Sequence, residues 1–108
     1  MILQNLKTYK ETIYKIEYDV IELEEGKYSQ SDLSKFFHEH TYTLFRRTKD
    51  GKTVKEMFFK DGKIHNEYGM ALVEFRKSKF LFYLNGIRFD EEEEFMNELR
   101  KIRLNEII

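Results

Sequence analysis

The chain has 108 residues, the length of one ordinary domain, so we expect a single domain over residues 1–108. Its content of 41% apolar and 16% aromatic residues excludes a disordered chain, and its formal net charge of −1 excludes attraction of the whole molecule to nucleic acid. It has no Cys, no basic-then-apolar leader and no apolar run near the about 20 residues that cross a bilayer. These absences predict a protein of the reducing cytoplasm that has no membrane partner.

The first 26 residues show the apolar stripe of an amphipathic helix, with positions three and four apart at Leu3, Leu6, Tyr9, Ile13, Ile16, Val20 and Leu23. Thr8 and Glu11 match a capping box, and Gly26 matches a helix stop, so we expect an N-terminal helix. A strand over about residues 12–23 is the alternative. It is supported by period-two alternation at Tyr14, Ile16, Tyr18 and Val20.

A short helix is expected next, because Ser31 and Asp32 are cap residues that precede Phe36 and Phe37. The chain then becomes rich in Thr, Phe, Leu and Val. Strands over 41–48 and 53–59 flank Lys49-Asp50-Gly51-Lys52, which predicts a hairpin.

The same turn signal returns at Asp61-Gly62 and Asn85-Gly86, with strands expected over 70–75 and 80–84. After Phe89 the period changes to that of a helix: Asp90 matches a cap, Glu93 follows three residues later, and one face carries Phe95, Leu99 and Ile102. The fold class predicted is α+β, an antiparallel meander of four to five short strands with both terminal helices packed on it.

The expected strand 80–84 is apolar on both faces, and so is the end of the expected strand 53–59, at residues 57–59. Such strands need cover on both sides. Either the second helix lies opposite the first, or an apolar patch remains for a partner or a second copy.

The segments "KDGKIHNEYGMA" (residues 60–71) and "FYLNG" (residues 82–86) resemble a degenerate hairpin repeat of phage and prophage proteins, in which an aromatic pair leads into Asn or Asp, Gly and Lys. The resemblance covers about residues 48–96, including the Glu-rich helix with which such arrays end. Asn66, Tyr68 and Met70 stand where the repeat has Arg, Asp and Pro. The resemblance implies an origin on a mobile element and a binding or scaffold role without known chemistry.

No catalytic or metal-binding constellation is found, so we expect a non-enzymatic protein without cofactor. His38 and His40 flank Glu39, but no Cys or paired acid completes a metal shell around them. For His65, we expect hydrogen bonding to the backbone of a turn.

Charge is segregated along the chain. Residues 90–98 carry six acids and no base, and the run Asp90, Glu91, Glu92, Glu93 and Glu94 exceeds what a helix dipole needs. The hairpin 41–63 carries seven bases against three acids, among them Arg46, Arg47, Lys49, Lys52 and Lys55. Solvated strand edges explain these bases better than nucleic-acid binding does, because no RNA-binding motif is present.

Together these features predict a small phage or mobile-element protein that binds and inhibits a host protein, with CRISPR effector nucleases as the first candidates. The acidic run would supply charge complementarity, and aromatic anchors would come from Phe59, Phe82 and Tyr83. One alternative is a nucleic-acid-binding module that uses the basic hairpin. Another is a structural, homo-oligomeric phage component whose aromatic face pairs with itself, as in a homodimer.

Overall fold

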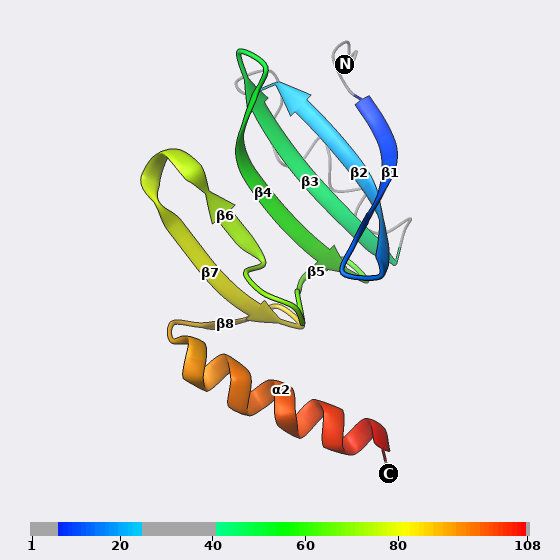
Figure 1. The fold of residues 1–108 in the computed structure, drawn as a ribbon, viewed down its shortest axis with the longest axis vertical. Helices are drawn as coiled ribbons and strands as arrows, with labels where there is room; N and C mark the ends of the chain where they lie inside the picture. The colour runs from blue at the N-terminus through cyan, green and yellow to red at the C-terminus, as the bar shows by residue number, and fades with distance from the viewer. Residues whose placement is uncertain (1–6, 25–40, 108) are drawn as a thin grey trace.

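The structure, a computed structural model, describes residues 7–24 and 41–107. Figure 1 shows a twisted mixed sheet with a C-terminal helix at one end. The helix is α2 (Glu92–Ile107), and a 3₁₀ turn, η2 (Phe75–Lys77), interrupts the strands. The strands are β1 (Lys7–Ile13), β2 (Ile16–Glu24), β3 (Tyr42–Lys49), β4 (Lys52–Lys60), β5 (Lys63–Ile64), β6 (Leu72–Glu74), β7 (Lys79–Leu84) and β8 (Ile87–Phe89).

The sheet has the order β1-β2-β3-β4-β6-β7-β8, and β5 pairs with β4 off this path. The predicted α+β class is confirmed, but the expected four to five strands are too few. The expected all-antiparallel meander is also wrong, because β2 and β3 pair in parallel. A parallel pair needs a long connection, and residues 25–41 separate these two strands.

Four two-residue turns join neighbouring strands, and all eight central residues have positive φ, as type I′ hairpin turns require. The sequence predicts three of them, Asp50-Gly51, Asp61-Gly62 and Asn85-Gly86, and the structure confirms these. The fourth is Tyr14-Lys15, with φ of 50° and 72°. Neither residue is one that prefers this conformation, so the turn leaves no signal in the sequence.

The expected N-terminal helix is wrong for the residues that the structure describes. Its place is taken by β1 and β2, and the alternative strand over about 12–23 is right for β2. The apolar spacing predicted a helix because it runs across two strands and the unrecognised turn between them. In the sheet, Val20 faces one side and Ile21 the other. The short helix expected around Ser31 to Phe37 lies outside the described residues.

The centre of the sheet is buried on both faces. One face carries Ile21, Leu23, Phe45, Met57 and Phe59, with Ile64 and Leu72 packed against them. The other carries Tyr18, Val20, Leu44 and Phe58, with Ile13, Ile16 and Tyr42. Two-sided burial of 57–59 is therefore confirmed, but β7 differs, since Phe80 at its start is 46% exposed.

Helix α2 confirms the expected C-terminal helix, but it packs on β7 and β8 rather than across the central strands (Figure 1). Its buried side chains Phe95 and Leu99 meet Leu84, each 2% exposed. The Phe82 and Phe95 ring centroids lie 4.7 Å apart. This third cluster holds the helix beside the sheet end and leaves the first turn of α2 open to solvent.

Replacing Lys15 with Gly should stabilise the protein, because a non-glycine residue at φ 72° is strained. We expect Lys15→Gly to raise the free energy of unfolding by about 1 kcal/mol in chemical denaturation. Lys10→Gly, the same change inside β1, is the control and should lower it by about 0.5–1 kcal/mol. A loss of stability in both variants would contradict a left-handed turn at Lys15.

Tyr18 should make stability fall at alkaline pH. It is 2% exposed, packs edge-on to Tyr42 and Phe58, and burial raises its pKa from 10.0 to about 12. Between these values the unfolded chain has lost the proton that the folded chain keeps, so the stability present below pH 10 declines by about 2–3 kcal/mol at most as the pH rises to about 12. Tyr18→Phe should flatten this decline in denaturant titrations. An equally steep decline in the variant would mean that another group causes it.

Candidate functional site

A groove of about 240 Å³ lies between α2 and the loop of residues 66–70. This volume is below the range of ordinary small-molecule pockets, so the groove fits one or two side chains of a partner better than a whole ligand. We call it the α2 groove; it is lined by Glu67, Tyr68, Gly69, Phe82, Glu92, Phe95, Met96, Leu99 and Arg103.

A buried histidine positions the loop side of the groove. His65 is 4% exposed, and its Nδ1 accepts a hydrogen bond of 2.9 Å from the Asn85 N–H. The ring proton must therefore be on Nε2, which lies 3.3 Å from the Glu67 carboxylate. The Gly86 N–H also donates to the Ile64 carbonyl, at 2.8 Å. The expectation that His65 bonds a turn backbone is confirmed. Together, these two backbone hydrogen bonds hold the segment of residues 64–65, and the loop that follows it, against the β7–β8 turn.

Asn66 then shapes the loop itself. It is 8% exposed; its Oδ1 accepts from the Tyr68 N–H and its Nδ2 donates to the Met70 carbonyl, both at 2.9 Å. The Asn66 side chain thus holds the turn formed by residues 66–70, and Gly69 within it does not adopt a left-handed φ. Tyr68 is left 49% exposed, with its ring stacked on Tyr14 at a centroid distance of 5.8 Å.

The helix side of the groove combines apolar groups with one acid, Glu92, and one base, Arg103. Met96 is 36% exposed, and beneath it Phe95 and Leu99 are buried in the third core cluster. Glu92 stands at the start of the helix. Of the site residues predicted from the sequence, the structure brings Phe82 and Glu92 into this one groove. Tyr68, Met96 and Glu67 were missed, because no local pattern shows that residues 66–70 lie beside α2.

The acidic run divides into two parts. Asp90 accepts a 2.7 Å hydrogen bond from Arg88 Nε, so its charge is paired. Glu91, Glu92, Glu93 and Glu94 are exposed, and no base within the described ranges forms an ion pair with them. Three of them lie in the first turn of α2, where they also complement the helix dipole.

The three aromatic residues predicted as anchors have different surroundings. Phe59 is 5% exposed within the sheet core, so it is a packing residue in this fold. Phe82 is half-buried against Phe95 and lines the α2 groove. Tyr83 is half-buried on β7, opposite Arg88 of β8.

The predicted basic residues do not form one surface. Arg46 faces three partners: its Nη2 lies 2.8 Å from Glu11 and 2.7 Å from Glu56, and its Nη1 donates to the Tyr9 hydroxyl at 2.7 Å. Burial alone would lower the pKa of Arg46, but the hydrogen bonds to Glu11 and Glu56 outweigh it and raise the pKa. Arg46 therefore joins β1, β3 and β4 as a structural cation.

The other four bases lie apart from Arg46. Lys49 and Lys52 are exposed on either side of the Asp50-Gly51 turn. Arg47 and Lys55 are half-buried on the sheet face opposite Arg46, because strand side chains alternate between faces. The Arg47 guanidinium lies 5.5 Å from the centroid of the Phe45 ring.

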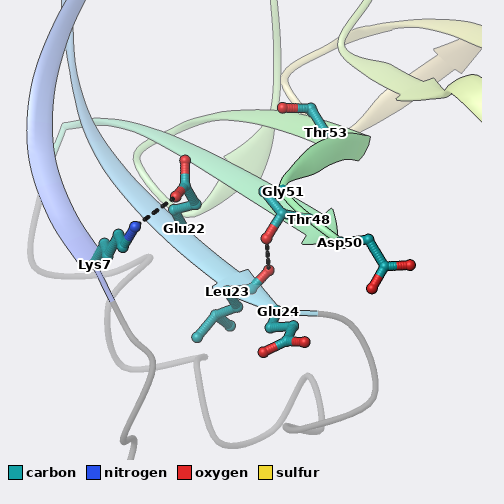
Figure 2. A pocket seen from close by; sticks show the side chains of 8 residues that line it. All are labelled: Lys7, Glu22, Leu23, Glu24, Thr48, Asp50, Gly51 and Thr53. Atoms are coloured by element: carbon teal, nitrogen blue, oxygen red, sulfur yellow. Dashed lines mark hydrogen bonds and ion pairs between the residues drawn. The ribbon is translucent and has the colours of Figure 1, made fainter.

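A second hollow, of about 400 Å³, lies near the ends of β2 and β3. Figure 2 shows its acids, Glu22, Glu24 and Asp50, with carboxylates that point in different directions. Lys7 lies 4.0 Å from Glu22, and Thr48 donates to the Leu23 carbonyl. Because its charged groups do not converge, this hollow offers no centre for a ligand.

The described part of the chain holds no group of three or more His, Asp or Glu placed to bind a metal ion. His38 and His40 lie outside that part. Within residues 7–24 and 41–107, no helix is long and apolar enough to cross a membrane.

Comparison of the chain with models of protein families, with curated proteins and with solved structures yields no match.

Asn66→Ala should destabilise the groove and the protein together, because it leaves the Tyr68 N–H and the Met70 carbonyl without their partner. We expect a loss of about 1–3 kcal/mol in unfolding free energy and faster amide exchange at Tyr68. Gly69→Ala is the control. A Cβ there meets no atom within 4 Å, so stability should stay within about 0.5 kcal/mol or rise slightly. Equal losses in both variants would mean that the Asn66 side chain does not hold the loop.

Proposed function

We propose that this chain is a non-enzymatic phage or mobile-element protein that binds a basic surface of a host protein through the α2 groove and thereby inhibits it. The observation that carries the proposal is that exposed apolar groups meet an unpaired acid, Glu92, in one groove, directly beside the other exposed glutamates of the run 91–94. Tyr68 and Met96 supply the apolar groups and Glu92 the unpaired carboxylate, whereas the Glu67 carboxylate is already held by the His65 ring at 3.3 Å. The partner chemistry that fits is an apolar side chain flanked by Arg or Lys.

The acids mainly raise the rate of association with the partner. Four consecutive exposed carboxylates, Glu91 to Glu94, raise the local negative potential well above that of a molecule with net charge −1. Such a patch accelerates association with a positively charged surface and contributes less to residence time.

The apolar groups mainly lower the rate at which the complex dissociates. Met side chains adapt to irregular surfaces, and Tyr is enriched among the residues that dominate interfaces. The stack of Tyr68 on Tyr14 holds the exposed ring in place before binding, which reduces the conformational entropy lost on association.

The identity of the partner rests on two supports. The hairpin repeat resembles that of phage and prophage proteins, which favours a host target. An acidic surface such as the exposed run of residues 91–94 competes best for a surface that normally binds nucleic acid. CRISPR effector nucleases meet both conditions and are the first candidates.

The test is binding of the nuclease-treated protein to a panel of purified CRISPR effectors by biolayer interferometry, with DNA cleavage as the second readout. We expect at least one effector to bind and to lose cleavage activity. Replacing Glu91 to Glu94 by Gln should lower its association rate about tenfold at low salt and flatten the salt dependence. Met96→Ala should instead raise the dissociation rate about tenfold.

Glu17→Gln is the matched control, because Glu17 is an exposed acid on β2 whose side chain pairs with Lys10. It should leave both rates unchanged. If no effector binds, the proposed partner is wrong. If an effector binds but the groove variants behave like Glu17→Gln, the α2 groove is not the site.

A further inference from the structure

A row of charged side chains crosses four strands on the sheet face opposite Arg46. The strand register sets Arg47 of β3 opposite Lys55 of β4, Lys55 opposite Glu74 of β6, and Glu74 opposite Lys79 of β7. Residues paired across antiparallel strands lie on the same face. We call Arg47, Lys55, Glu74 and Lys79, with Lys77 of η2, the basic row.

The row is electrostatically unfavourable in the free protein. Like charges directly opposite each other destabilise a sheet, and Arg47 directly faces Lys55. Burial lowers the pKa of Lys55, Arg47 lowers it further, and Lys79 and Lys77 act in the same direction. Among the described residues, Glu74 is the acid that opposes these cations and raises the pKa of Lys55.

Glu74 is one acid among several cations, and it is already paired with Arg76, so it does not neutralise the row. It is 8% exposed, and its Oε1 has no hydrogen-bond partner, with the Arg76 Nε at 3.6 Å. On the opposite face, by contrast, Arg46 is held by Glu11 and Glu56 at under 3 Å. The same sheet thus pairs Arg46 with two carboxylates and leaves a positive excess around Lys55, as an anion-binding surface requires.

We propose that the basic row binds the phosphodiester backbone of a single-stranded nucleic acid. Neighbouring strands lie about 4.8 Å apart, so Arg47 and Lys79 are about 14 Å apart along a line, which suits a chain of regularly spaced charges. Phe75, in the same η2 turn as Lys77, is 48% exposed and offers a ring on which a base can stack. A charged sheet face with an exposed aromatic is a surface that single strands recognise.

This site is independent of the α2 groove. It also differs from the basic hairpin expected from the sequence, since it excludes Arg46 and adds Lys77 and Lys79 from elements beyond residue 63. The stacking ring makes nucleic acid a better fit than an acidic protein, which would use the charges alone.

The test is fluorescence anisotropy with a labelled thymidine homopolymer across a series of salt concentrations. Contacts from Arg47, Lys55, Lys77 and Lys79 should give a slope of log K against log salt of about −3. The double variant Lys77→Gln with Lys79→Gln should weaken binding about tenfold and reduce the slope by about 1.4. Phe75→Ala should weaken binding about tenfold at an unchanged slope.

The control is Lys10→Gln with Lys101→Gln, which removes the same charge from exposed side chains on β1 and α2. It should change the affinity less than twofold. Equal weakening in the control would mean that the overall charge of the protein causes the binding, and it would overturn the proposed site. Absence of binding at low salt would also overturn it, and competition by polyglutamate as strong as that by the oligonucleotide would assign the row to an acidic protein instead.

Discussion

The hydrogen bond from the Asn85 N–H to the buried His65 ring is the constraint on which the C-terminal half of the molecule depends. It locks the segment after β5 to the turn between β7 and β8. Since α2 follows β8 directly, the same contact determines how the helix sits relative to the loop of residues 66–70. The His65 imidazole therefore fixes the positions of both sides of the α2 groove. A loop and a helix that are distant in sequence become a defined surface in this way.

The molecule keeps its charges apart, although its net charge is close to zero. On one sheet face, Arg46 is enclosed by carboxylates and a phenol from two other strands, which fastens β1 to the sheet centre. The opposite face carries the basic row around Lys55. The acids that would balance that row stand instead in the first turn of α2. A basic ligand and an anionic ligand would thus meet different ends of the protein.

Packing explains why α2 leaves its acidic turn exposed. The central strands are already buried on both faces, so the helix finds its apolar partners at the sheet end, against Leu84 and Phe82. A helix laid across the middle of the sheet would have had to cover core residues that are already covered. The position at the end leaves Met96 and the glutamates before it accessible, and the proposed binding surface depends on this exposure.

The amino-acid sequence by itself determined the elements whose signals are local. Asp-Gly and Asn-Gly placed three hairpin turns, because those residues favour positive φ, and the 3.6-residue period placed the C-terminal helix. The hydrogen bond of His65 to a turn backbone was also expected, from its place in the hairpin-repeat pattern. Only the tertiary structure decided the rest. Tyr14-Lys15 turns without a favourable residue, so two strands were mistaken for a helix. The adjacent arginines 46 and 47 received opposite roles because neighbouring strand residues face opposite sides. Lys55, Lys77 and Lys79 came together only through strand register, which depends on pairing between segments far apart in the chain.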